Sequence, residues 1–133
     1  MRVSEADPEQ FAEAVSVLDA AALRTDAERI RAGIDAGNVL VATAARTGNE
    51  TDQSTVLGAL VCSDGEVTAV AVRPNRRGQG IGSALVAEAL RREGRLVAEF
   101  DPRVRAFWES LGFEIDPVAG SERLRGVRDR SLE

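Results

Sequence analysis

The fold of this chain is decided by one stretch, Val67-Thr68-Ala69-Val70-Ala71-Val72-Arg73-Pro74-Asn75-Arg76-Arg77-Gly78-Gln79-Gly80-Ile81-Gly82-Ser83. A β-branched apolar run stops at the proline, three glycines follow at alternate positions, and an amphipathic helical pattern then begins. This order predicts a strand, a glycine loop and a helix. Glycines let the backbone approach a ligand closely, and the free N–H groups at a helix start suit a negatively charged group. The stretch therefore predicts an anion site for a phosphate-bearing ligand.

Two well-known phosphate loops do not fit this stretch. A Walker A loop needs a Lys after its last glycine, and this chain contains no Lys. A dinucleotide-binding fingerprint needs glycines at its first, third and sixth positions. Counted from Gly78, the sixth position is Ser83, and counted from Gly80 it is Leu85. Too little chain follows to complete a Rossmann domain, so the dinucleotide-binding fingerprint does not fit either.

Length, composition and charge limit the domain number, the location and the kinds of ligand that this chain can have. The 133 residues, 44% of them hydrophobic, predict one small domain with a core of its own. No apolar run approaches the length of a membrane span, no signal peptide is recognisable, and a cytoplasmic protein is expected. The net charge of −5 disfavours nucleic-acid binding, and one Cys with no His makes a metal site improbable. Four arginines near the C-terminus are expected to be solvated: Arg123, Arg125, Arg128 and Arg130.

The first half of the chain predicts a strand over 1–6, two helices and then three strands. Asp7-Pro8 and a Thr25-Asp26 capping box begin the helices, whose connection is expected near 22–26. The strands are expected over 39–45, 55–63 and 66–72, with a polar loop over 46–54. Because Asp64-Gly65 is a strong hairpin signal, these three strands are expected to form an antiparallel meander.

The second half predicts a helix to about Glu93, a strand over 96–100, a helix from Asp101-Pro102 and strands over 113–115 and 124–127. A strand, a helix and a further strand imply a parallel, right-handed crossover. The predicted fold class is therefore α+β, with a mixed and mostly antiparallel sheet, one parallel crossover and helices on both faces. Helical spacing places four apolar residues on one face of the last helix: Val104, Phe107, Trp108 and Leu111.

Two motifs carry a resemblance to a known family. Arg77, Gly80 and Gly82 form an Arg-x-x-Gly-x-Gly pattern that resembles the coenzyme A loop of the GNAT (Gcn5-related N-acetyltransferase) superfamily. The segment Arg105-Ala106-Phe107-Trp108-Glu109-Ser110-Leu111-Gly112-Phe113 looks like the late helix of that family. The predicted order β-α-α-β-β-β-α-β-α-β is also similar to the GNAT fold. The chain is therefore expected to be one GNAT-like N-acetyltransferase domain over 1–133, with an acyl-CoA-binding core at about 66–115.

The resemblance implies an acetyl-CoA-dependent N-acetyltransferase that acts on a primary amine by direct attack in a ternary complex. It also implies that acetyl-CoA lies where the fourth and fifth strands splay apart, and it leaves a homodimer open. A tight turn without a ligand is the plain alternative, but three alternate glycines with Arg76 and Arg77 exceed what a turn needs. The implied binding residues are Val70, Ala71, Val72, Arg77, Gly78, Gln79, Gly80, Ile81, Gly82 and Ser83.

The chain has no His and no Tyr, so acid–base chemistry is left to carboxylates, Cys62 or water. Glu66 matches the glutamate base of the histone acetyltransferase branch and is the candidate general base. It also follows a turn, where an exposed charge is commonplace. Glu99 and Asp101 are secondary candidates, and Asp101 is equally explained as a helix N-cap.

This sequence departs from the family's pattern at a position that many members use in catalysis, so other functions stay open. Trp108 stands where many members place a Tyr that protonates the departing thiolate, and an indole N–H donates a hydrogen bond without usefully transferring a proton. Helical spacing also favours Trp108 as a core aromatic, and Cys62 reads as a small apolar strand residue. A non-catalytic acyl-CoA sensor or regulatory domain is therefore the alternative function, and a ligand-free structural domain is a third.

Overall fold

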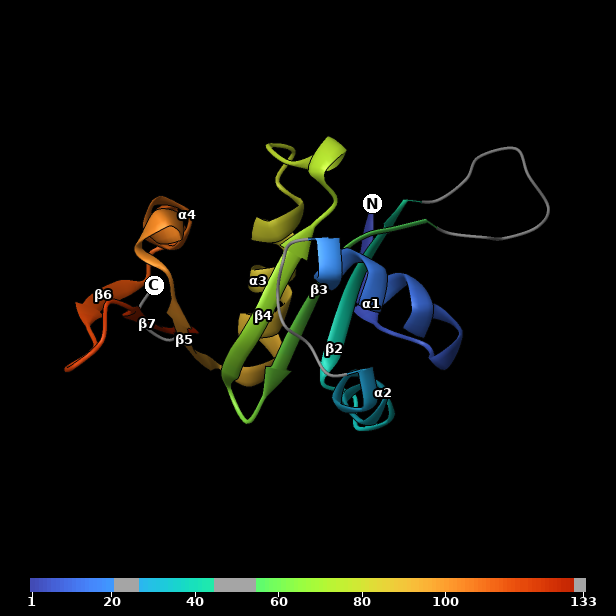
Figure 1. Ribbon diagram of the computed structural model, residues 1–133, viewed down its shortest axis with the longest axis horizontal. Helices are drawn as coiled ribbons and strands as arrows, with labels where there is room; N and C mark the ends of the chain where they lie inside the picture. The colour runs from blue at the N-terminus through green and yellow to red at the C-terminus, as the bar shows by residue number, and fades with distance from the viewer. Residues whose placement is uncertain (21–26, 45–54, 131–133) are drawn as a thin grey trace.

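The computed structural model describes residues 1–20, 27–44 and 55–130. These residues form one seven-stranded mixed sheet in the order β1-β2-β3-β4-β5-β7-β6, with helices on both faces (Figure 1). The predicted fold class is confirmed. The elements are β1 (Arg2–Glu5), α1 (Phe11–Ala20), α2 (Ala27–Asp35), β2 (Val39–Ala44), β3 (Thr55–Ser63), β4 (Glu66–Val72), α3 (Ile81–Glu93), β5 (Arg95–Phe100), α4 (Arg105–Ser110), β6 (Glu114–Pro117) and β7 (Leu124–Asp129).

Short-range signals placed most element ends correctly. Asp64 and Gly65 both have positive φ, 52° and 81°, as the predicted two-residue hairpin between β3 and β4 requires. Gly94 ends α3 in the left-handed conformation, and its N–H donates to the Leu90 carbonyl. At the other end of the chain, the Asp7 N–H donates to the Gln10 side chain across a 3₁₀ turn. The Thr25-Asp26 cap, the 22–26 connection and the 46–54 loop lie outside the described residues.

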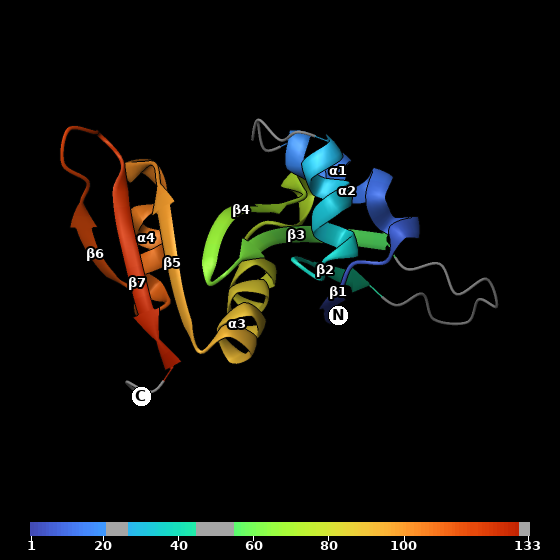
Figure 2. The ribbon, with the colours of Figure 1, turned by 90° about the horizontal axis from the view of Figure 1, so that it is seen from below.

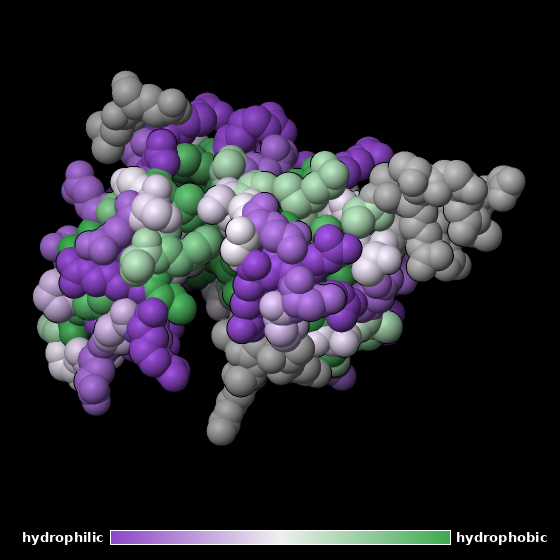
Figure 3. Space-filling model, turned by 90° about the horizontal axis from the view of Figure 1, so that it is seen from above, coloured by the Kyte–Doolittle hydropathy of each residue, from purple (hydrophilic) through white to green (hydrophobic). Residues whose placement is uncertain are grey.

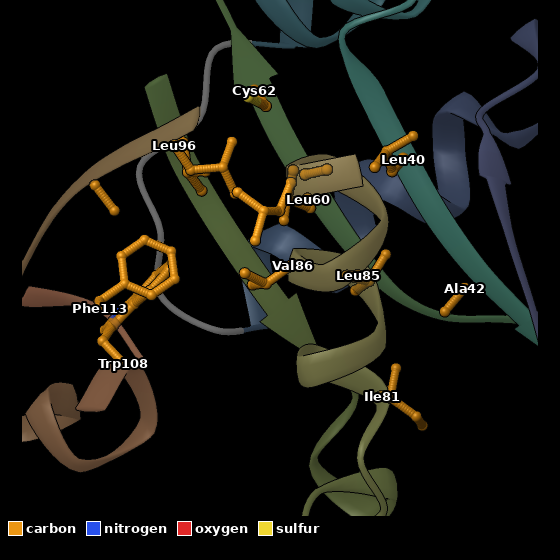
Figure 4. Packing of buried hydrophobic residues seen from close by; sticks show 14 of the residues in the cluster. Leu40, Ala42, Leu60, Cys62, Ile81, Leu85, Val86, Leu96, Trp108 and Phe113 are labelled. Carbon is orange, nitrogen blue, oxygen red and sulfur yellow. The ribbon is translucent and has the colours of Figure 1, made fainter. Parts of the chain in front are cut away.

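Two apolar cores lie on opposite faces of the sheet. Figure 2 shows α1 and α2 on one of these faces and α3 on the other. On one face α1 and α2 cover β2–β4, with Val17, Leu18 and Ile34 buried there. On the other face α3 packs Ile81, Leu85 and Val86 against β2–β5, as the close view in Figure 4 shows. Cys62 is buried in this second core, and burial raises the pKa of its thiol to about 11. Its buried place in β3 agrees with the prediction that Cys62 is a small apolar strand residue.

The parallel crossover between β4 and β5 is present but short. Only two residue pairs join the strands, Glu66 with Val97 and Val67 with Ala98. Beside this point the β3–β4 register shifts, so that Thr68 is an extra residue in β4. The bulge also changes the side-chain phase, because Val67 packs against α3 whereas Ala69 packs on the opposite face. Beyond the bulge β4 stays with β3, and β5 turns away.

The end of the chain differs most from expectation. The last strand, β7, runs six residues and lies between β5 and β6 rather than at the edge of the sheet. The four arginines in and beside β7 were expected to be solvated, and Arg123, Arg125 and Arg130 are exposed whereas Arg128 is half-buried. Three of the four also donate to backbone carbonyls of other segments, which the sequence did not indicate. Arg123 donates to the Glu99 carbonyl, Arg128 to the Leu111 carbonyl and Arg130 to the Arg91 carbonyl. These guanidinium groups connect β7 and its two flanking residues to β5, to the end of α4 and to α3.

Candidate active site

The separation of β4 from β5 opens a cleft of about 760 Å³. One wall is β4 with the following loop and the first turn of α3, and the other wall is the end of β5 with α4 and the start of β7. Figure 3 shows apolar residues (green) lining the hollow between the two lobes of the molecule. The cleft therefore has a largely apolar interior. Arginines of both walls, Arg76, Arg77, Arg103 and Arg123, also line it.

The β4 wall offers backbone groups that no strand satisfies. The N–H and C=O groups of successive strand residues point to opposite edges of the strand. Because the Arg73 N–H donates to the Leu57 carbonyl in β3, the backbone groups of Val72 and Val70 point to the opposite edge. That edge faces the cleft, since β5 pairs with β4 only at its first two residues. The bulge at Thr68 thus gives the cleft a row of hydrogen-bonding groups.

The loop at the mouth of the cleft has the geometry of an anion site. Gly78 and Gly80 have φ of 79° and 82°, and a Cβ at either position would meet no atom within 4 Å. The Ala84 N–H donates to the Gly80 carbonyl and is the first helical bond of α3. The N–H groups of Ile81, Gly82 and Ser83 therefore have no partner within the helix. Open space, free donors and the positive end of the helix dipole coincide here.

The arginines around this loop divide into two roles. Arg77 lines the cleft, and its Nε lies 3.4 Å from the Val72 carbonyl, at the junction of β4 and the loop. Arg76 lines the cleft as well. Arg73 is not part of the cleft lining: its Nε donates to the Val56 carbonyl of β3 at 2.6 Å, and its guanidinium lies 3.7 Å from Glu13 of α1. Arg73 therefore anchors the strand end, whereas Arg76 and Arg77 supply charge to the cleft.

Nine of the ten residues expected to bind the ligand line the cleft, and Gln79, exposed on the loop, does not. Glu66 lies outside this lining, at the exposed start of β4 next to the hairpin. Glu99 and Asp101 both line the β5 wall. The Arg103 backbone N–H and guanidinium donate to Asp101 and lower the pKa of its carboxyl. In the part of the chain that the structure describes, no ion pair occupies Glu99.

Aromatic rings that the sequence pattern assigned to the core also form part of the cleft. Trp108 stacks on Phe100, with ring centroids 5.3 Å apart, and meets Phe107 and Phe113 edge-on. Trp108 is only 5% exposed, yet Trp108, Phe107 and Phe100 all line the cleft. Val104 was expected on the same buried face but is 44% exposed, because it ends a 3₁₀ turn before α4 begins. The helical stripe identified the core role of Phe107 and Trp108 but gave no sign that they border a cleft.

Comparison with known proteins identifies this arrangement. The model of the acetyltransferase (GNAT) domain matches residues 34–115, more than half of the chain. The chain belongs to the GNAT acetyltransferase family. The matched segment runs from the end of α2 to β6 and contains the glycine loop and most of the cleft.

Solved structures share the GNAT fold over nearly the whole chain. Rv2747 from Mycobacterium tuberculosis, in complex with CoA and NLQ, has a TM-score of 0.75 at 16% identity, covering 97% of this chain and 99% of that one. The PaiA N-acetyltransferase from Thermoplasma acidophilum, in complex with coenzyme A, has a TM-score of 0.73 at 15% identity, with 96% and 98% covered. Ard1 from Thermoplasma volcanium has a TM-score of 0.71 at 19% identity, with 96% of both chains covered. No curated protein sequence matches the chain.

Among the residues described, no group of His, Cys, Asp and Glu side chains is arranged to hold a metal ion. Over the same residues, no helix has the length and apolar character needed to cross a membrane.

Proposed function

We propose that this GNAT domain is an acetyl-CoA-dependent N-acetyltransferase that transfers acetyl to a primary amine by direct attack in a ternary complex. The observation that carries the proposal is the apolar cleft between two parallel strands with an anion-binding loop at its mouth. The CoA complexes of two similar folds, one of them named an N-acetyltransferase, support the same ligand. We further propose that residues 1–133 form one domain whose acyl-CoA-binding core spans about 66–115.

The residues present fit the parts of acetyl-CoA. The pyrophosphate would meet the loop 77–83, where the free N–H groups of α3 and the Arg77 charge favour an anion. The extended, amide-bearing pantetheine would follow β4, where Val70 and Val72 present to the cleft backbone groups that no neighbouring strand pairs. This assigns backbone roles to both valines, whose side chains pack toward α3. Gln79 would contribute through its place in the loop.

Acetyl-CoA supplies the acetyl group as an activated thioester. In direct transfer the amine nitrogen bonds to the carbonyl carbon, the C–S bond breaks, and its electron pair leaves on sulfur. The amine must be neutral to attack, so its proton passes to a carboxylate or to water. Glu99 is the better-placed carboxylate, because it lines the cleft without an ion-pair partner among the described residues. Glu66 stays a candidate that would act from outside the lining.

The test is a calorimetric titration of acetyl-CoA against the wild type, Gly80→Asp and Gly80→Asn, at low and high salt. Asn and Asp have similar size and both tolerate positive φ, so the pair isolates the added charge. We expect the wild type to bind, and Gly80→Asp to bind about 10-fold more weakly than Gly80→Asn, with a gap that narrows in salt because screening weakens the repulsion. A folded wild type that does not bind would overturn the proposal.

A measurement of turnover then distinguishes an acetyltransferase from a non-catalytic acyl-CoA sensor. The lack of His and Tyr in this chain favours the non-catalytic acyl-CoA sensor as the second candidate. Release of free CoA in the presence of an amine panel, with acetylated amine found by mass spectrometry, supports the enzyme. Saturable acetyl-CoA binding with no release for any amine supports the sensor. The homodimer and the cytoplasmic location stay predictions.

A further inference from the structure

The side chain of Arg123 reaches the cleft from the far side of β5. Arg123 directly precedes β7, which pairs with the edge of β5 that faces away from β4. Its Nη2 donates to the Glu99 carbonyl at 2.8 Å. That carbonyl points toward the cleft, because Val97, two residues earlier in β5, directs its N–H to the Gly65 carbonyl on the β4 side. The guanidinium of Arg123 therefore lies at the cleft edge of β5, in agreement with its place in the cleft lining.

The charge of Arg123 is not neutralised by the described part of the chain. Arg103, the other arginine of this wall, forms an ion pair with Asp101 at 3.1 Å. Among the described residues, no carboxylate forms an ion pair with Arg123, and its hydrogen bond to Glu99 uses one of the five N–H groups of a guanidinium. The carboxylate of Glu99 lines the same wall. An unpaired cation and an unpaired anion thus lie next to each other in the cleft.

Glu99 and Arg123 lie on the face of the sheet opposite to α3. Side chains alternate between the two faces along a strand, and Ala98, Phe100 and Leu124 all pack into the core on the α3 side. The side chains of Glu99 and Arg123 therefore point to the other face. The glycine loop, in contrast, leads directly into α3. An anion held by Arg123 is therefore separate from the pyrophosphate that the loop would hold.

We propose that Arg123 binds a carboxylate of the acceptor, and that the acceptor is a free α-amino acid whose α-amine is acetylated. This inference rests on the proposed function and names its substrate class. A guanidinium is planar and donates two parallel hydrogen bonds to a carboxylate. The amine proton would pass to Glu99 as the N–C bond forms, while the C–S bond breaks and its electron pair leaves on sulfur.

The spacing of the two groups selects this class of amine. Arg123 contacts the backbone carbonyl of the same residue whose side chain is the candidate base. An amine held by Glu99 and a carboxylate held by Arg123 are therefore only a few bonds apart in the acceptor. A free α-amino acid has this spacing. A protein N-terminus and a lysine side chain within a protein carry no backbone carboxylate beside the amine, and a polyamine has no carboxylate.

Matched acceptors test the inference on the wild-type protein. The common L-amino acids and their carboxamides are each supplied with acetyl-CoA, and CoA release and the product mass are measured. The carboxamide has the less basic amine, so a preference for the free acid comes from the protein. We expect an amino acid to be acetylated with a kcat/KM about 10- to 100-fold above that of its carboxamide, the value of a hydrogen bond to a charged group. Transfer to no amino acid, or an equal kcat/KM for acid and carboxamide, overturns the inference.

Variants of Arg123 then test the residue assignment. Arg123→Gln should raise the KM for the amino acid about 10- to 100-fold and leave the KM for the carboxamide within a factor of two. Arg123→Lys keeps the charge but loses the planar fork, and its KM should lie between the two. Arg95→Gln makes the same charge change at the exposed start of β5, outside the cleft lining. It should keep the preference for the acid, and an equal loss of preference in this variant overturns the role of Arg123.

A second source of anion is the 3′-phosphate of CoA, and the same variant distinguishes it. We expect Arg123→Gln to bind CoA and 3′-dephospho-CoA as the wild type does, within a factor of two by calorimetry. A loss of CoA affinity that is absent for 3′-dephospho-CoA would make Arg123 a phosphate ligand, which overturns the inference and leaves the proposed function intact. If Arg123→Gln does not fold, the preference of the wild type decides. If the folded wild type does not bind acetyl-CoA, the proposed function is overturned, and this inference with it.

Discussion

Gly82 in α3 and Phe107 in α4 touch across the end of the cleft. A Cβ added to Gly82 would lie 3.2 Å from Phe107 Cε1 and 3.3 Å from its Cζ. Gly82 has no positive φ, so its lack of a side chain is required by this approach rather than by the backbone. The contact holds the two cleft walls at a fixed separation on the α3 side of the sheet.

Enlarging Gly82 should therefore push the walls apart. We expect Gly82→Val to lower the free energy of unfolding by about 1–3 kcal/mol, since its side chain overpacks against Phe107. Phe107→Ala in the same chain should return part of this loss, and urea unfolding of both single variants and the double variant measures the coupling. Strictly additive effects would show that Gly82 and Phe107 do not constrain each other.

Replacing Arg77 should weaken the ligand's electrostatic attraction. We expect Arg77→Gln to raise the Kd for acetyl-CoA about 10-fold and to reduce its dependence on salt, because a cation that lines the cleft is lost. Arg95→Gln makes the same charge change at an exposed position outside the cleft lining. Calorimetry at two salt concentrations compares them, and equal Kd values for both variants would contradict a specific role for Arg77.

The base assignment is decided by two matched carboxylate-to-amide changes. If Glu99 takes the amine proton, Glu99→Gln should lower kcat about 10²- to 10⁴-fold while the acetyl-CoA Kd stays within a factor of two. Glu66→Gln should then keep most of the activity, since Glu66 lies outside the cleft lining. Initial rates with a responsive amine measure both. A large loss of kcat in Glu66→Gln but not in Glu99→Gln would establish Glu66 as the base. Full activity in both variants would mean that water accepts the amine proton.

Acid should weaken a network that joins α3 to β1. Glu88 accepts from Arg91 and Arg92, and Arg92 also reaches Glu5 at 2.8 Å. The hydrogen bonds from Arg91 and then Arg92 lower the pKa of Glu88 from 4.5 to about 2. Because the folded-state pKa lies below the unfolded value, this stabilisation is complete above about pH 4.5 and is lost as the pH falls toward 2.

The corresponding variant is Glu88→Gln. At pH 7 it should be less stable than the wild type by about 1 kcal/mol, the upper value for an ion pair at the protein surface. The difference should shrink between pH 4.5 and 2, as measured by urea unfolding across that interval. A difference that does not change with pH would mean that Glu88 acts through packing and not through its charge.

The features that the sequence alone predicted correctly are those that depend on local backbone conformation. The Asp64-Gly65 hairpin, the Gly94 helix end and the loop glycines Gly78 and Gly80 are conformations of a few neighbouring residues, and the residue types that favour them are few. The strand, the loop and the helix around the glycine stretch could therefore be predicted without knowing any contact with a distant part of the chain. The same locality explains why nine of the ten expected ligand-binding residues fall on one cleft.

The tertiary structure decided what depends on distant contacts. The length over which β4 pairs with β5 sets the width of the cleft, and this pairing stops at Val67, next to the bulge at Thr68. Which carboxylate faces the cleft follows from that geometry, and so does the position of Trp108 in the cleft wall. A sequence pattern records which side of an element is apolar. It does not record whether that side meets another element or borders an open cleft, because this is settled only when the two halves of the sheet pack together.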